Sequence, residues 1–159
     1  MRKVRAMGIT ASALVVSAVV TGCGTGAAST PAAPTELDIR NLFLTWNAAL
    51  ATGDPQKVAD LYAPDAVLLP TVSNQVRRTR TEIVDYFTKF LKDKPQGEMR
   101  DQIVDVLDTD TAVNAGVYEF TLTKEGKQQH VKARYTYVYE LRDGKWLIVN
   151  HHSSAMPEG

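Results

Sequence analysis

Apolar residues recur at the spacing of a helix through the first segment of the chain that has a clear periodicity. Between Thr35 and Gly53 they fall three or four positions apart, which predicts an amphipathic helix. Thr35 and Asp38 have the spacing of a capping box at its start, and Gly53 provides its end. The predicted buried face consists of Leu42, Phe43, Trp46, Ala49 and Leu50.

Two further helices and one strand are predicted before the pattern changes. Asp54 caps a short helix that ends at Pro64, and residues 66–69 form a brief apolar strand. After a polar loop, Thr79 or Thr81 caps a third helix. The apolar stripe of this third helix is Ile83, Phe87, Phe90 and Leu91.

After Gly97 the hydrophobic period changes from 3.6 to 2, which predicts strands. The connections between them are short, and the last two contain Gly126 and Gly144, so neighbouring strands are expected to be antiparallel. Helices followed by strands indicate an α+β fold, with three N-terminal helices packed on one face of a curved antiparallel sheet. The predicted strands cover about residues 99–107, 112–123, 129–141 and 145–154.

The N-terminal residues have the pattern of a secretion signal. Arg2, Lys3 and Arg5 precede a weakly apolar run over 7–20, and no acidic residue occurs before Glu36. Fourteen residues rise only ~21 Å as a helix, which is short of the ~30 Å hydrocarbon core of a bilayer. The run therefore predicts a signal peptide rather than a membrane span.

The end of this run, Val20-Thr21-Gly22-Cys23, resembles the bacterial lipobox. The resemblance implies cleavage before Cys23 and lipidation of its thiol, with enough acyl chains for stable anchoring. The alternative is a soluble secreted protein with an incidental Cys. We expect a signal peptide over 1–22, a lipidated Cys and flexible tether over 23–34, and a domain over 35–159. This predicts a secreted protein anchored to a membrane in the bacterial cell envelope.

Composition narrows the function classes. The 159 residues include 18 Lys+Arg, 18 Asp+Glu and a single Cys. One Cys excludes an intramolecular disulfide and a Cys-rich zinc site. The sequence has no run of basic residues, so a nucleic-acid partner is not expected. Removal of residues 1–22 takes away three basic residues and no acidic one, which leaves 15 basic against 18 acidic residues. The mature chain is therefore slightly acidic.

A motif-rich segment closes the chain, and a helical hairpin from Trp46 to Leu61 lies near the start of the domain. Together they resemble the association (hub) domain of calcium/calmodulin-dependent protein kinase II, a member of the nuclear transport factor 2-like (SnoaL-like) superfamily. The resemblance covers about Glu36 to Pro157, and no kinase signature accompanies it. The residues of the closing segment are Arg142-Asp143-Gly144-Lys145-Trp146-Leu147, Val149, His152, Ser154 and Pro157.

The resemblance implies a cone of curved sheet and three helices around a pocket, and assembly into a homodimer or higher homo-oligomer. The superfamily includes isomerases, dehydratases, cyclases and non-catalytic binding proteins, so the fold alone does not decide the function. The hub pocket has arginines that bind small carboxylates, and two of those positions correspond here to Tyr118 and Tyr137. The resemblance therefore implies a more aromatic and less cationic pocket.

Alternation along residues 134–140 separates two sets of side chains. Tyr135, Tyr137 and Tyr139 share one face of the predicted strand, where they could line the pocket or form an ordinary aromatic core. Arg134 has the opposite parity. It could pair with a carboxylate across a dimer contact, or a bulge could turn it into the pocket to bind an anionic ligand.

Few residues suggest catalysis. The adjacent His151 and His152 should point to opposite faces of a strand. The resemblance aligns His152 with a histidine of the hub domain, and Asn150 and Ser154 share its face. His152 could act as a general acid or base or be a hydrogen-bonded structural residue. Asp65 could act as a base only if its side chain turned inward. No metal or cofactor site is expected.

These observations favour a lipid-anchored, non-catalytic oligomeric domain that binds a small molecule in its cone. The proposed ligand-binding residues are Tyr118, Tyr135, Tyr137, His152 and Arg134. The alternative is a cofactor-independent isomerase or cyclase that acts on a small aromatic or polyketide-like substrate. A third possibility is a structural module whose pocket has collapsed. Arg77, Arg78 and Arg80 are expected to be a solvated cluster.

Overall fold

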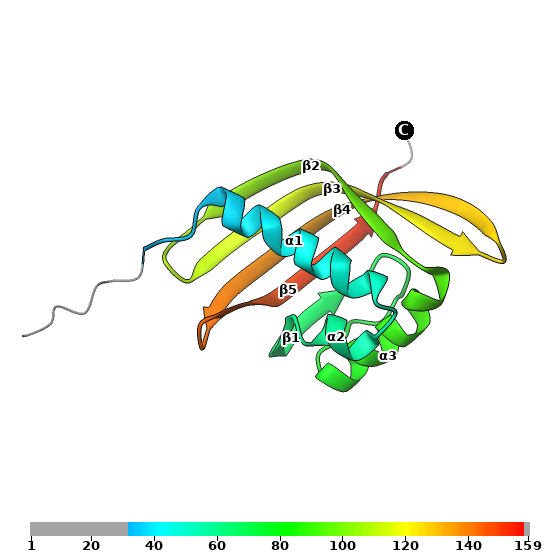
Figure 1. Cartoon of the computed structure of the whole chain (residues 1–159), viewed down its shortest axis with the longest axis horizontal. Coiled ribbons are helices and arrows are strands. Elements are labelled where there is room, and N and C mark those ends of the chain that lie inside the picture. The colour runs from blue at the N-terminus through cyan, green and yellow to red at the C-terminus, as the bar shows by residue number, and fades with distance from the viewer. Residues whose placement is uncertain (1–31, 158–159) are drawn as a thin grey trace, which may run out of the picture. The chain divides into compact units, whose positions relative to one another are not determined.

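The computed structural model describes residues 32–157, so the predicted signal peptide and Cys23 lie outside the described residues. A five-stranded sheet curves around one long helix, and two shorter helices cover one end of the same face (Figure 1). This confirms the predicted α+β class. In chain order the elements are α1 (Glu36–Ala51), α2 (Pro55–Ala59), β1 (Tyr62–Leu69), α3 (Arg80–Phe90), the 3-10 helix η1 (Leu91–Asp93), β2 (Gln96–Val106), β3 (Thr111–Lys124), β4 (Lys127–Arg142) and β5 (Lys145–Ala155).

Local side-chain contacts explain where the helices begin. At α1 the Thr35 hydroxyl accepts from the Asp38 amide at 3.2 Å, and the Thr35 amide donates to the Asp38 carboxylate at 2.9 Å. Thr79 and Glu82 form the same reciprocal pair at α3, so Thr79 and not Thr81 is the cap. Each capping box satisfies backbone amides that have no partner inside the helix.

The strand order is β1-β5-β4-β3-β2, with all neighbours antiparallel except β1 and β5. The four long strands are antiparallel neighbours, as predicted, whereas β1, whose partner the sequence did not indicate, pairs in parallel with β5. β1 also begins at Tyr62, four residues before the predicted strand, and it includes Pro64. Because β1 is an edge strand, a proline there removes no hydrogen bond from the interior of the sheet.

The regular pairing of the sheet is interrupted at three places, one between β1 and β5 and two that each contain a single extra residue. Between β4 and β5 the register passes from Val138 opposite Asn150 to Tyr139 opposite Ile148, so Val149 is an extra residue. Between β2 and β3, Arg100 is extra in the same way. Each extra residue exchanges the faces on which the following side chains lie and bends the strand.

The core lies between the inner face of the sheet and the helices. Trp46 of α1 packs edge-on against Phe87 of α3 and against Tyr137 of β4, with ring centroids 6.2 and 5.9 Å apart. Such edge-to-face pairs are favourable beyond the apolar area that they bury. The fully buried side chains include Ile39, Phe43, Leu68, Ile83, Phe87, Tyr137 and Ile148.

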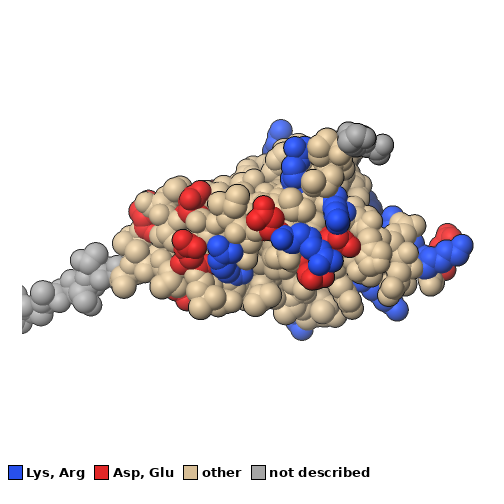
Figure 2. Space-filling model, turned by 90° about the horizontal axis from the view of Figure 1, so that it is seen from above, with Lys and Arg blue, Asp and Glu red and all other residues tan. Residues whose placement is uncertain are grey.

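Acidic and basic side chains are interspersed on the face of the molecule seen in Figure 2. Arg100 contacts Glu98 at 2.9 Å and Glu119 at 3.3 Å, and Lys132 lies 3.8 Å from the same Glu119. Neighbouring opposite charges weaken the long-range field of either sign. Within residues 32–157, no helix is long and apolar enough to cross a membrane.

Candidate functional site

The tyrosine row of β4 faces the helices. Tyr135, Tyr137 and Tyr139 are 3%, 0% and 2% exposed, and Tyr118 of β3 is 2% exposed on the same inner face. Tyr118 and Tyr135 stack in parallel with centroids 4.9 Å apart, and Tyr137 stacks on the His151 ring at 4.1 Å. The row therefore forms one wall that is aromatic over its whole length, with phenol groups at the tips.

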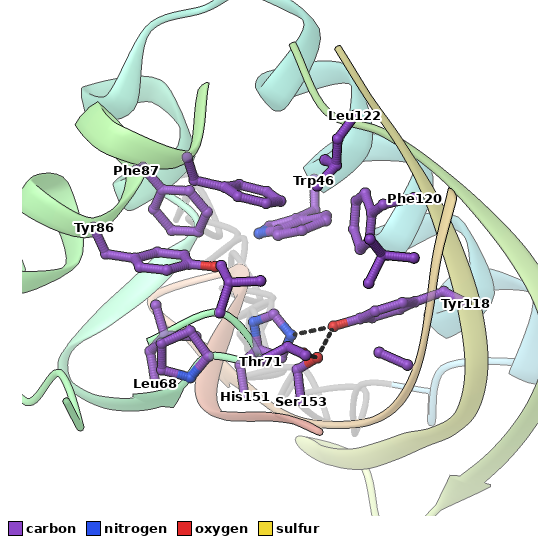
Figure 3. Close-up of a pocket in the computed structure, with 15 residues that line it drawn as sticks. Trp46, Leu68, Thr71, Tyr86, Phe87, Tyr118, Phe120, Leu122, His151 and Ser153 are labelled. Atoms are coloured by element: carbon purple, nitrogen blue, oxygen red, sulfur yellow. Dashed lines mark hydrogen bonds between the residues drawn. The ribbon is translucent and has the colours of Figure 1, made fainter. Parts of the chain in front are cut away.

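A small cavity lies where this wall meets α3 and the segment after β1 (Figure 3). Its volume is about 30 Å³ in this arrangement of side chains, enough for about one or two water molecules. Most of its wall is aromatic or aliphatic, while hydroxyl and imidazole groups gather on one side. It is lined by Trp46, Leu68, Pro70, Thr71, Val72, Tyr86, Phe87, Phe90, Tyr118, Phe120, Leu122, Val131, Ala133, His151 and Ser153.

Tyr118 of the predicted ligand-binding set lines this cavity, whereas Tyr135 and Tyr137 lie beside it. Tyr135 donates to the Asn114 carboxamide oxygen at 2.9 Å. The hydroxyls of Tyr137 and Tyr139 and the Asn114 amide nitrogen are buried and have no partner among the described residues. Whether any of these residues binds a ligand remains a prediction.

Polar side chains form a chain of hydrogen bonds from the core to the cavity mouth. Trp46 Nε1 donates to the Tyr62 hydroxyl at 3.1 Å, and this hydroxyl lies 2.9 Å from His151 Nδ1. His151 Nε2 lies 3.5 Å from the Tyr118 hydroxyl, at the long limit of a hydrogen bond. Tyr118 donates to Ser153 Oγ at 2.5 Å. Ser153 in turn contacts Thr71, whose side chain is partly exposed at the mouth.

Burial keeps the ionisable members of this chain neutral. Desolvation, followed by the charge of neighbouring His152, lowers the pKa of His151 to about 3. Desolvation raises the pKa of Tyr118 and Tyr62 above their ordinary value, although the hydrogen bonds with Ser153 and Trp46 oppose the shift. Tyr86, on the opposite wall, has a pKa raised by burial in the same way. The cavity is therefore uncharged at neutral pH.

The structure corrects the predicted position of the pocket histidine. His152 is exposed on the outer face of the sheet, opposite Thr136, whereas His151 is 4% exposed and lies opposite Tyr137. Simple alternation from Ile148 places residues 150, 152 and 154 inside, but the extra residue Val149 reverses this parity. His151 and Ser153 consequently occupy the inner face, where His152 and Ser154 were expected.

Arg134 and Asp65 both lie away from the cavity. Arg134 is exposed on the outer face, opposite Ser154 of β5, so the bulge that would turn it inward does not occur at this position. Asp65 is exposed and accepts from Arg142 at 2.5 Å, and this hydrogen bond lowers its pKa. A carboxylate held by an arginine at the surface cannot serve as a base for a substrate in the cavity.

One arginine of the predicted solvated cluster is buried. Arg77 is 7% exposed, and its guanidinium donates to Asp85 of α3 at 3.0 Å. Its amide and carbonyl also pair with Leu68 at 2.9 Å in both directions. These contacts fix the far end of the segment that contributes Thr71 and Val72 to the cavity mouth, so Arg77 acts as an anchor for that segment.

The cavity can bind a mostly apolar, uncharged molecule and form hydrogen bonds with its polar group. A general base functions best when its pKa is near the working pH, and the pKa of His151 lies far below neutral pH. Within residues 32–157, no three His, Cys, Asp or Glu side chains gather as metal ligands. Trp46, Tyr62, Thr71 and Ser153 belong to the polar chain although their sequence positions gave no sign of it. Only the folded register brings them together.

Comparisons with known proteins give a consistent assignment of the fold and family. The profile of the calcium/calmodulin dependent protein kinase II association domain matches residues 35–157. A protein of known structure from Xanthomonas campestris, proposed to be such an association domain, is 62% identical over 83% of this chain and 95% of its own, with a TM-score of 0.78. Among curated proteins, none matches the sequence.

Two more distant structures show how widely the fold is shared. The association domain of the Caenorhabditis elegans kinase is 16% identical over 75% of this chain and 94% of its own, with a TM-score of 0.62. A Streptomyces avermitilis protein of the nuclear transport factor 2-like family, proposed to be a dehydratase, is 15% identical over 76% of this chain and 95% of its own, with a TM-score of 0.66. At these identities the likeness concerns the fold alone.

Proposed function

Since this chain belongs to the calcium/calmodulin-dependent protein kinase II association-domain family, we propose that it is a non-catalytic, self-associating domain that holds a small molecule in its cavity. The observation that supports binding is the cavity itself, in which a chain of polar groups meets an aromatic wall. Concave apolar sites with a few convergent polar groups are the usual form of small-molecule sites. The low pKa of His151 argues against the alternative of acid–base catalysis.

The outer face of the sheet supports self-association. Its central residues on β3 and β4 are small or β-branched and only partly exposed, and the helices lie on the other face. In register across the two strands, Val113 pairs with Val138 and Ala115 with Thr136. A sheet face with small and β-branched side chains can pack against a second copy, as in sheet-on-sheet contacts. We propose a homo-oligomer built on this face.

A charged residue placed in this face should prevent assembly. Val138→Lys would bury an unpaired ammonium in the proposed contact, so the dissociation constant of the oligomer should rise at least about tenfold, equivalent to about 1.4 kcal/mol. Light scattering of the purified domain would measure the mass, and circular dichroism would check the fold. Leu44→Lys, at an exposed apolar position of α1, is the matched control and should leave the mass unchanged. A wild-type domain that is monomeric at high concentration would contradict the proposal.

We further propose that the domain is attached to a membrane of the bacterial cell envelope through lipidated Cys23. The support is the lipobox-like sequence that ends at the only Cys of the chain. In cells fed an alkyne-labelled fatty acid, the wild-type protein should incorporate the label and sediment with membranes. Cys23→Ser should lose both properties, because no other thiol can replace it. Unchanged labelling of this variant would refute lipidation at Cys23.

A further inference from the structure

We propose that the cavity selects an uncharged molecule with a hydrogen-bond acceptor, such as a ketone, ester or amide carbonyl, on an aromatic or aliphatic body. The acceptor would receive the hydroxyl proton of Thr71 at the cavity mouth. This inference rests on the proposed ligand-binding function and specifies the class of ligand. The hydrogen bonds that lead from the core to the mouth have one direction, and this direction makes Thr71 a donor.

Trp46, at the inner end of the series of hydrogen bonds, fixes the donor-to-acceptor direction. The Trp46 indole nitrogen can only donate, so the Tyr62 oxygen accepts from it at 3.1 Å. Tyr62 has one proton of its own and is 5% exposed, and His151 Nδ1 lies 2.9 Å from its oxygen. The arrangement that leaves no buried hydroxyl proton without an acceptor has Tyr62 donating to Nδ1.

The two nitrogens of the His151 imidazole keep the same donor-to-acceptor direction in the middle of this series of hydrogen bonds. A neutral histidine has one N–H, and if Nδ1 accepts from Tyr62, the proton is on Nε2. Nε2 then points its proton at the Tyr118 oxygen, 3.5 Å away. Tyr118 donates in turn to Ser153 Oγ at 2.5 Å (Figure 3). Each group accepts on its inner side and donates on its outer side.

The outer end of the chain is therefore a donor. Ser153 has accepted from Tyr118, so its own proton is directed to Thr71 Oγ1, with which it is in contact. The Thr71 hydroxyl, which also lies near the Tyr118 oxygen, is then the last donor of the series and can turn its proton towards a molecule at the mouth. A ligand that presents an acceptor to Thr71 continues the chain, whereas one that presents only a donor would meet another proton.

The remaining walls exclude charged ligands. The described lining contains no Lys, Arg, Asp or Glu, and burial keeps His151 neutral. A carboxylate or ammonium placed here would lose its hydration without gaining a counter-ion, which is costly. The Arg77 guanidinium does not line the cavity; its Nη1 donates to Asp85, whereas its Nε is buried without a partner among the described residues. The apolar body of a ligand would instead contact Trp46, Tyr86, Phe87, Phe90, Phe120 and Leu122.

The size of the cavity indicates how such a ligand would enter. Its volume of about 30 Å³ is too small for a benzene ring, so the ligand must displace part of the wall. Val72 is 55% exposed and adjoins Thr71 at the mouth, whereas Arg77 holds the base of the same segment through Leu68 and Asp85. Movement of Thr71 and Val72 about this anchor would widen the mouth.

The NMR resonance of the Trp46 indole N–H provides the test, because this side chain lines the cavity and is the first donor of the series of hydrogen bonds. The domain from residue 31 onward, which contains every described element, would be titrated with acetophenone, ethylbenzene, benzoate and benzylammonium. Trp146, the only other tryptophan, does not line the cavity, so its resonance is the internal control, and Trp146→Phe assigns both signals. Acetophenone should bind about fivefold more tightly than ethylbenzene, as expected for one added hydrogen bond, and far more tightly than either ion.

Thr71→Val tests the terminal donor. It should weaken acetophenone binding about fivefold and leave ethylbenzene unchanged, whereas Val76→Thr, exposed on the same segment and outside the cavity, should change neither. Equal affinity of the wild-type domain for acetophenone and ethylbenzene, or tightest binding of benzoate, would overturn the inference and leave ligand binding standing. If no probe moves the Trp46 signal, the ligand-binding function itself fails. Preserved amide dispersion would show that each variant is folded.

Discussion

Acidification from pH 7 to pH 4.5 should lower the free energy of unfolding by about 3 kcal/mol through His151 alone. Burial lowers the pKa of this residue to about 3, whereas its ordinary value of ~6.5 applies in the unfolded chain. Between these values the unfolded state binds more protons than the folded state. The stabilisation is thus complete above pH 6.5 and is lost as the pH falls towards 3, by about 1.4 kcal/mol per unit.

Urea unfolding at several pH values would measure this slope. His151→Gln keeps a hydrogen-bonding side chain but cannot take up a proton, so its stability should be much flatter between pH 6.5 and 4.5. His152→Gln removes only the smaller of the two causes of the shift and should keep most of the slope. Measurements above pH 4.5 avoid the titration of carboxylates such as Asp65 and Asp85, whose pKa values are lowered by ion pairs. An equal slope in the wild type and His151→Gln would show that His151 is not buried as described.

Gly116→Ala should destabilise the domain by about 3 kcal/mol, because a Cβ at this position would collide with the backbone of the neighbouring strand. The added atom would lie 2.7 Å from the Asp101 carbonyl carbon and closer still to its oxygen. Gly116 pairs with Gln102, beside the bulge at Arg100, and the Gln102 carbonyl accepts from Arg40 of α1 at 3.0 Å. The close approach of the two backbones at this point allows the sheet to curve.

Gly144→Ala is the matched control for this substitution. Gly144 also has a positive φ, of 75°, but no atom lies within 4 Å of an added Cβ. The strain of the left-handed conformation alone should cost about 1 kcal/mol. Thermal or urea unfolding of both variants would compare the two effects. If the two glycines prove equally sensitive, the collision at Asp101 is not the source of the effect.

Much of the fold follows from the sequence because the responsible interactions are local. The capping boxes at Thr35 and Thr79 join residues three positions apart, and the tight turns at Gly126 and Gly144 use positive φ angles. Such features need no knowledge of distant strands. The start of β1 was missed because Pro64 favours the end of a helix, and only its place at the sheet edge makes a strand acceptable.

The site was harder to predict because its residues meet only through tertiary contacts. The tyrosine row was found from alternation within one strand, and the structure confirms that Tyr135, Tyr137 and Tyr139 face the helices. The partners of Arg77 could not be deduced, because its burial depends on pairing with Leu68 and Asp85. Likewise, no local signal places Tyr62 next to His151, 89 positions later.

The extra residue in β5 has a consequence for comparing this chain with its relatives. Because Val149 is an extra residue in β5, His151 faces the interior and His152 faces solvent, which is the reverse of what simple alternation predicts. An identical residue in an aligned column therefore faces the same way only in relatives that have the same bulge. A family member without it would present the side chains of residues 150, 152 and 154 to its interior, and two nearly identical sequences could then select different ligands.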